Sequence, residues 1–234
     1  MNFSFESSII HRRYESDGTW TYTWQHGRQL AGMSKTGTNI AYGYDSDGKR
    51  ITKTVNGTTY NYHYLGDQLV ELTWGSNKLH FTYDSTGPLS VNCNGAEYFY
   101  VKNAQGDVTG LVSTSGTRVV TYTYDAWGNP LTTTGSLAET LGEQNPLRSR
   151  GYVYDTETGL YYLQSRYYNP GWGRFINVDE YLSTGQSFFG NNVFASFRIG
   201  ETVNVRNSCR WDDRSEICIL STIQRMRCGV ELLA

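Results

Sequence analysis

The chain has 234 residues and a formal net charge of -2, and it is rich in tyrosine (19) and glycine (25). This charge gives no general electrostatic reason to bind nucleic acid or an anionic membrane. No apolar run reaches the ~18 residues of a membrane span, and the opening lacks the basic start and apolar stretch of a secretory signal. The chain is therefore not expected to be transmembrane. It is either made inside the cell or belongs to a longer protein whose upstream part carries the signal.

Cysteine and histidine give no support for a metal or catalytic centre. Cys93, Cys209, Cys218 and Cys228 are too few for a disulfide scaffold and form no C-x-x-C pair. The four histidines are scattered, so no Ser/His/Asp or Cys/His arrangement has positional support. We therefore expect no metal and no cofactor.

An aromatic-x-aromatic triplet recurs along the chain with a period near twenty residues. Residues i and i+2 of a strand point to the same face, so each triplet predicts a half-buried strand. A period of this length is typical of a repeat architecture. The second aromatics of the triplets are Trp24, Tyr44, Tyr64, Tyr83, Tyr100, Tyr124 and Tyr154.

An aspartate follows the triplet in the best copies, and a glycine comes three residues later. Asp at the first position and Gly at the fourth are preferred in type I turns, so the unit is strand, tight turn, strand. Turn chemistry explains these aspartates better than metal binding, because each has its own glycine and they lie far apart. The pairs are Asp45 with Gly48, Asp84 with Gly87, Asp125 with Gly128 and, in a turn lengthened by one residue, Asp155 with Gly159.

Strand positions follow from these signals and from Asn56-Gly57, a strong hairpin signal between alternating runs. A polar loop with a short turn of helix at 137–140 is expected after Thr132. From Phe197 onward tyrosine and lysine are absent, and an apolar spacing at 219–226 favours a short amphipathic helix. We expect strands near 20–24, 38–44, 49–55, 58–64, 68–74, 78–83, 97–101, 108–113, 117–124 and 150–155.

The repeat aromatic-x-Tyr-Asp-x-x-Gly resembles the YD repeat of Rhs proteins, bacterial wall-associated relatives and teneurins. Residues 145–183, with "YDTETGLYYLQSRYYNP" and "GRFINVD", look like the Rhs-associated core that ends such arrays. The resemblance covers about residues 14–195. It divides the chain into a YD-repeat sheet (14–131), an RHS-associated core (132–195) and a divergent tail (196–234), which we expect to be truncated or frameshifted. The core motif residues are Arg166, Tyr167, Tyr168, Pro170, Gly173, Arg174 and Phe175.

The resemblance implies an all-β fold, in which an antiparallel hairpin ribbon forms part of a YD shell and a short irregular C-terminal tail follows. In many bacterial members the shell encloses a variable C-terminal toxin. The implied partners are upstream YD repeats of the same polypeptide, a C-terminal toxin, and immunity or delivery proteins. The implied location is secreted or at the cell surface, as part of a longer protein. A fragment of this size leaves a strand edge where upstream repeats continue, and such an edge favours association.

Some members of this family cleave themselves beyond the core with aspartates. Asp179 falls on the family's pattern, but Glu180 stands where proline is usual and Asn207 occupies the position of the second aspartate. Aspartyl chemistry needs two carboxylates that share a proton, and Asn cannot supply one of them. We therefore expect Asp179 to be a turn or cap carboxylate. A self-cleaving aspartyl core stays the enzyme-class alternative.

The tyrosine-rich sheet leaves a second alternative, a cell-surface protein that binds carbohydrate. Aromatics that recur at the structural period are better explained as cross-strand pairs. A ligand site would need aromatics outside that period, and the candidates are Trp127 and Trp172, both in turns. The leading prediction is structural: part of a container for a C-terminal effector, without chemistry of its own. Arg50, Arg148, Arg150, Arg166 and Arg174 are expected to pair with acids or to cover tyrosine rings.

Overall fold

The computed structural model describes residues 15–26 and 29–177. The chain divides into two compact units, residues 1–196 and 197–234, and all described residues belong to the first. They form two antiparallel sheets, one of 12 strands and one of four. The all-β prediction is confirmed. The expected tail and its helix lie outside the described residues.

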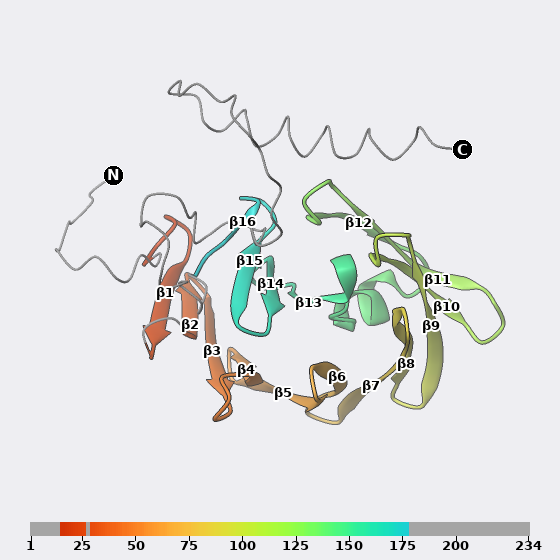
Figure 1. Ribbon diagram of the computed structural model, residues 1–234, viewed down its shortest axis with the longest axis horizontal. Coiled ribbons are helices and arrows are strands. Elements are labelled where there is room, and N and C mark those ends of the chain that lie inside the picture. Colours follow the sequence, from red (N-terminus) through yellow and green to blue (C-terminus); the bar gives the residue numbers. More distant parts are fainter. Residues whose placement is uncertain (1–14, 27–28, 178–234) are drawn as a thin grey trace, which may run out of the picture. The chain divides into compact units, whose positions relative to one another are not determined.

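The large sheet is a ribbon in which every strand pairs with its neighbours in sequence. Figure 1 shows its strands following one another around an arc, with the small sheet on the inner side. The strands are β1 (Thr21–Gln25), β2 (Gln29–Lys35), β3 (Thr38–Tyr44), β4 (Arg50–Val55), β5 (Thr58–Leu65), β6 (Gln68–Trp74), β7 (Asn77–Asp84), β8 (Gly87–Cys93), β9 (Ala96–Lys102), β10 (Val108–Ser113), β11 (Arg118–Tyr124) and β12 (Pro130–Thr134).

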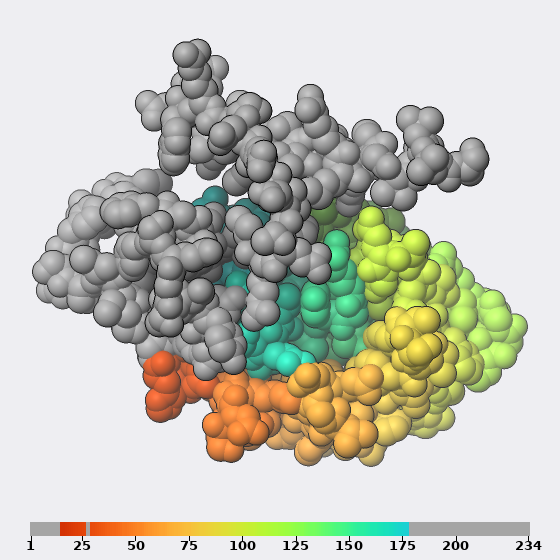
Figure 2. Space-filling view, in the orientation of Figure 1, coloured from red at the N-terminus to blue at the C-terminus, as the bar shows by residue number. Residues whose placement is uncertain are grey.

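The small sheet contains the core motif. Two helical turns, η1 (Ala138–Gly142) and η2 (Ser149–Gly151), lead to it from β12. In the space-filling view its teal atoms lie against the orange strands of the ribbon (Figure 2). Its strands are β13 (Val153–Asp155), β14 (Leu160–Leu163), β15 (Arg166–Asn169) and β16 (Arg174–Phe175).

The expected strands are all present, although the last shortens to Val153–Asp155. The structure also contains six strands that were not expected, and none of them carries an aromatic-x-aromatic triplet followed by Asp and Gly. They are β2, β8, β12, β14, β15 and β16. Pro88 and Pro130 each lie at or next to the start of a strand, where a missing N–H is tolerated. The expected boundary between 131 and 132 falls inside β12, and the division into three domains stays a prediction.

One β-bulge accompanies nearly every repeat and lies just before the second aromatic of the triplet. Thus Gly43 pairs with Thr52 whereas Tyr44 pairs with Arg50, which leaves Ile51 as the extra residue. The same shift makes Leu89 and Leu131 extra residues on β8 and β12. These three side chains are 38%, 41% and 60% exposed. At these three bulges an aliphatic side chain is therefore turned outward, while the aromatic face stays inside.

Candidate functional site

A fully buried arginine lies where the ribbon meets the small sheet. Arg50 begins β4 and is 0% exposed. Its guanidinium carbon is 4.7 Å from the ring centroid of Tyr62 on the ribbon and 4.5 Å from that of Tyr162 on β14. Tyr42 and Tyr167 lie within 6 Å on the same two sides. Aromatic rings from both sheets thus enclose a single cation.

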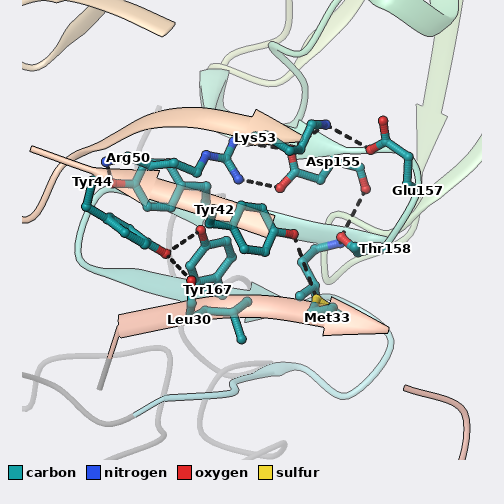
Figure 3. Close-up of polar contacts among 12 residues, drawn as sticks. Leu30, Met33, Tyr42, Tyr44, Arg50, Lys53, Asp155, Glu157, Thr158 and Tyr167 are labelled. Carbon is teal, nitrogen blue, oxygen red and sulfur yellow. Dashed lines mark hydrogen bonds and ion pairs between the residues drawn. The ribbon is translucent and has the colours of Figure 1, made fainter. Parts of the chain in front are cut away.

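Asp155 on β13 neutralises this cation. Its Oδ1 accepts a hydrogen bond of 3.1 Å from Arg50 Nη2, and its Oδ2 accepts from Nη1, so the pair is bidentate. Lys53 Nζ lies 3.1 Å from Asp155 Oδ1 and 2.9 Å from Glu157 Oε2 (Figure 3). We call these four residues, Arg50, Lys53, Asp155 and Glu157, the clamp. It joins β4 to β13, which are 105 residues apart in sequence at the Arg50–Asp155 pair.

Asp155 and Lys53 keep their charges at neutral pH. Burial alone would raise the pKa of Asp155, but Arg50 and Lys53 outweigh it, and the pKa lies below the ordinary aspartate value. Burial would likewise lower the pKa of Lys53, yet Asp155 holds it above the ordinary lysine value. Two cations and two carboxylates balance, which offsets the cost of taking them out of water.

Tyrosine hydroxyls form a second layer of contacts around the clamp. Tyr44 Oη and Tyr167 Oη are 2.9 Å apart, and Tyr44 donates to the Leu30 carbonyl at 2.7 Å. The Arg50 backbone N–H donates to Tyr162 Oη at 2.7 Å. Burial raises the pKa of Tyr162 to about 12, so the hydroxyl stays protonated. These residues fix the register of the small sheet on the ribbon.

A second group of contacts joins the core to the later strands of the ribbon. Tyr100 on β9 donates to Asn145 Oδ1 at 2.7 Å, and Tyr161 on β14 donates to the Gly128 carbonyl at 2.7 Å. The Arg148 guanidinium stacks 3.8 Å from the ring centroid of Tyr122. The core is therefore bonded to β3 and β4 early in the ribbon and to β9 and the β11–β12 turn late in it. Arg50 and Arg148 cover tyrosine rings, as expected, whereas Arg166 covers the ring of Phe175.

Asp45 and Asp125 lie in turns of the kind that the sequence predicts. Asp45 Oδ1 accepts from the backbone N–H of Lys49 at 2.8 Å, and Gly48 takes a φ of 80°. Asp125 does the same for Asn129 at 2.9 Å, with Gly128 at a φ of 83°. The third copy is tighter, because Asp84 pairs directly with Gly87 across a two-residue loop.

The fourth copy, at Asp155, differs from the prediction in what its carboxylate binds. Its backbone carbonyl still accepts from Gly159 N at 2.8 Å, so the lengthened turn exists. Its carboxylate belongs to the clamp instead of capping the turn, because a buried Arg50 requires a counter-charge. One sequence signal could have found this: Lys53 lies opposite Tyr42 at an inward position, where an acid must accompany a cation. Nothing local identifies which acid it is.

The core motif residues hold the small sheet together. Tyr167 and Phe175 are each 2% exposed, Pro170 is buried, and Arg166 lies 3.6 Å over the Phe175 ring centroid. Tyr168 donates to the Trp127 carbonyl at 3.1 Å, which ties the motif to the turn between β11 and β12. Arg174 is exposed. Tyr167, Pro170 and Phe175 are therefore buried, whereas Arg174 lies on the surface.

Trp127 and Trp172 are both exposed, at 40% and 37%. Trp127 packs beside Gly173, where a Cβ would approach its ring to 3.3 Å, so larger residues are disfavoured there. Asp179, Glu180 and Asn207 lie outside the described residues. Within residues 15–26 and 29–177, no cluster of three or more His, Cys, Asp or Glu is placed to hold a metal ion. No helix in the same part of the chain is long and apolar enough to cross a membrane.

Comparisons with known proteins agree with this architecture. A family model described as RHS Repeat matches residues 103–140. The tRNA(Glu)-specific nuclease WapA of Bacillus subtilis subsp. natto is 45% identical over 204 residues, which cover 84% of this chain and 9% of the relative. The tRNA3(Ser)-specific nuclease WapA of Bacillus spizizenii is 41% identical over 204 residues, with the same shares of 84% and 9%.

A solved structure shares the fold. A chain in "Crystal Structure of TcdB2-TccC3-Cdc42" superposes with a TM-score of 0.58 at 18% identity, covering 75% of this chain and 9% of that chain. This chain therefore spans about a tenth of the length of the WapA relatives and of that chain. The RHS Repeat match and these relatives show that the chain belongs to the Rhs (YD-repeat) family.

Proposed function

We propose that this chain is the C-terminal part of an Rhs shell that encloses or presents a C-terminal toxin effector in a secreted or contact-delivered system. The observation that carries the proposal is the clamp, because Arg50 and Asp155 hold the core against the inner face of the ribbon. A core fixed there would close one end of a container. The relatives named as nucleases support a toxin as cargo.

The container function also requires parts that a longer polypeptide would supply. Upstream YD repeats would continue the ribbon from β1, which pairs with β2 on one side. The toxin would follow the core, and immunity or delivery proteins would act on the assembled particle. Secretion or surface display would be directed by the longer protein.

Protease protection tests this proposal. The complete polypeptide, with its upstream repeats and downstream toxin, would be treated with protease, and the survival of the toxin segment would be followed by mass spectrometry. We expect the toxin to survive in the wild type and in Asp47→Asn, an exposed acid outside the clamp. Asp155→Asn should expose it, because the core loses its main attachment. Equally rapid digestion of the toxin in the wild-type particle would contradict the container function.

Two alternative functions, carbohydrate binding and self-cleavage, each have a test of their own. The exposure of Trp127 and Trp172 favours a carbohydrate-binding function, which requires saturable binding on a glycan array that is lost in Trp127→Ala or Trp172→Ala. A self-cleaving core requires Asp179. Intact-mass measurement of the purified protein decides this, since we expect one uncut species that is unchanged in Asp179→Asn.

A further inference from the structure

The two edges of the ribbon, where its strands end and the chain turns back, differ in polarity. The turns of one edge contain only threonine, serine, asparagine and glycine. Among the described residues, no exposed large hydrophobic side chain lies in these turns. We call this side of the ribbon the polar edge, and its turns are 36–37, 56–57, 75–76, 94–95 and 114–117.

The opposite edge, which we call the apolar edge, carries exposed hydrophobic side chains. Eight large hydrophobic side chains are exposed in the described part of the chain, and five of them lie in or beside the turns of this edge. Scattered exposed hydrophobic side chains need no explanation, but their concentration on one side of a sheet is typical of a contact surface. The five are Ile51, Leu65, Leu89, Trp127 and Leu131.

The aliphatic side chains of the apolar edge follow the period of the repeat. The extra residues of four bulges form a row on β4, β6, β8 and β12, and they are Ile51, Val70, Leu89 and Leu131. Alternate strands of a sheet lie about 9.6 Å apart, twice the spacing of neighbouring strands. The row therefore suits a partner that has the same period.

Several charged groups of the apolar edge have partners within it. The Asp45 carboxylate accepts from the backbone N–H of Lys49, and the Lys49 ammonium lies 3.3 Å from Asp67. The Lys102 ammonium lies 3.6 Å from Asp84. A partner would therefore gain most by covering the aliphatic side chains, because that removes apolar surface from water.

The curvature of the ribbon indicates which partner would lie on this edge. Figure 1 shows the strands following an arc from β1 to β12, with the small sheet on its inner side. Upstream repeats that continued this arc beyond β1 would come round towards β12, where the chain already lies. They would have to pass beside the described turn of the ribbon, along one of its two edges. The chain spans 9% of its WapA relatives, so a longer polypeptide of that size would supply enough residues for a further turn.

We propose that the apolar edge packs against the preceding turn of the ribbon, formed by upstream YD repeats of a longer polypeptide, and that the polar edge faces away from that turn. Leu65, Leu89 and Leu131 are buried in this contact. A turn built from the same repeat has the same period, so its hairpins meet the row one after another. The presence of upstream repeats rests on the proposed container function, whereas the choice of edge rests on the exposed side chains.

Hydroxyl-radical footprinting of the complete polypeptide tests this contact, because the radical oxidises exposed side chains faster than buried ones. Leu65 is 72% exposed in the described structure, and Phe99, on the outer face of β9, is 40% exposed. After correction for intrinsic reactivity, Leu65 should react at least about threefold more slowly than Phe99, since the central residues of an interface are fully buried. Faster or equal oxidation of Leu65 would overturn the proposal. So would protection of Leu65 that disappears on dilution, because a second copy would then be the partner.

Two matched substitutions at opposite ends of β5 compare the edges. Leu65→Glu places a charge at the apolar edge and Thr58→Glu places one at the polar edge, and both positions are exposed in the described structure. Burying a charge is costly, so Leu65→Glu should open the contact and raise the oxidation of Leu89 in the complete polypeptide at least about threefold. Thr58→Glu should leave that oxidation unchanged. Equal effects of the two variants, or no effect of either, would refute the assignment.

The edge contact and the container can fail separately. If Leu65 is protected but the toxin segment of the complete polypeptide is digested like an unprotected chain, the container is wrong and the edge contact stands. If the toxin is protected but Leu65 is oxidised faster than Phe99, the container stands and the edge assignment is withdrawn.

Discussion

The clamp brings four charged side chains together where the two sheets meet, and three of them, Arg50, Lys53 and Asp155, are buried. Arg50 and Asp155 are each 0% exposed. Replacing such a cluster by apolar residues is often neutral for stability, whereas removing one member leaves an uncompensated charge. The value of the clamp therefore lies in specificity. Only the correct placement of β13 on β4 pairs all the charges, so a core shifted along the ribbon is penalised.

The first prediction concerns the members of the clamp. Asp155→Asn should lower the free energy of unfolding by about 3 kcal/mol, because Arg50 stays buried without its carboxylate. Arg50→Met should have a similar effect. The double variant Arg50→Met with Asp155→Leu should lose much less than the sum of the single variants. Denaturant unfolding measures each value, and Asp47→Asn should stay within about 0.5 kcal/mol of the wild type. Additive losses would contradict the pairing.

The second prediction is the pH dependence of the clamp. The pKa of Asp155 is depressed in the folded chain, so its contribution to stability is complete above the unfolded value near 3.8. That contribution is lost as the pH falls through the folded pKa. The difference in melting temperature between wild type and Asp155→Asn should thus be constant from pH 7 to about pH 5 and shrink below about pH 4. A difference that does not change across this range would show that Asp155 is not ionised in the fold.

At the scale of elements, side chains in the turns connect one hairpin to the next along the edge of the ribbon. Asn56, in the turn between β4 and β5, accepts at Oδ1 from Asn39 N at 2.8 Å and donates from Nδ2 to the Gly37 carbonyl at 3.1 Å. Asn94 repeats the pattern toward Asn77 and Lys78. Each of these asparagines therefore fixes the angle between successive hairpins and, through it, the curvature of the ribbon.

The third prediction distinguishes the hydrogen bonds of the Asn56 side chain from the effect of its backbone conformation in the turn. Asn56 has a φ of 46°, which glycine and aspartate also tolerate. Asn56→Gly keeps the turn but loses both hydrogen bonds, so it should cost about 1 kcal/mol. Asn56→Asp keeps the acceptor and should cost less. Thermal unfolding of the two variants, with Asn94→Gly as the equivalent change in another hairpin, measures the effect. An aspartate variant as unstable as the glycine variant would contradict a role for the Asn39 contact.

The elements show how far the sequence predicts this fold. Aromatic triplets, the Asp-Gly turns and Asn56-Gly57 located all strands of the ribbon except β2, β8 and β12, because their residue types have local reasons to occur. The partner strands β2 and β8 carry weak local signals and form because the neighbouring strands need hydrogen-bonding partners. The acid that pairs with Arg50 was not predictable, since the Arg50–Asp155 pair joins residues 105 positions apart. The bulges moved Arg50 inward and Ile51 outward, which simple alternation does not reproduce.

At the scale of the whole described unit, ribbon and core depend on each other. In a simple repeat protein each unit contacts only its neighbours, and stability adds up along the chain. Here the core contacts β4 through the clamp, β3 through Tyr167 and Tyr44, and β9 through Asn145 and Tyr100. These long-range bonds make independent unfolding of the small sheet costly. We therefore expect the core and strands β3 to β5 to open together.

Hydrogen exchange measured by mass spectrometry tests this cooperation, because it reports the free energy of opening for each segment. If core and ribbon open as one unit, Asp155→Asn should accelerate exchange in β3 to β5 and in β13 to β15 by the same factor. That factor should be at least about tenfold, since a loss above about 1.4 kcal/mol changes an opening constant by that much. Asp47→Asn should leave both segments unchanged. Acceleration confined to β13 to β15 would instead mean that the core is a separately opening lid on a self-supporting ribbon.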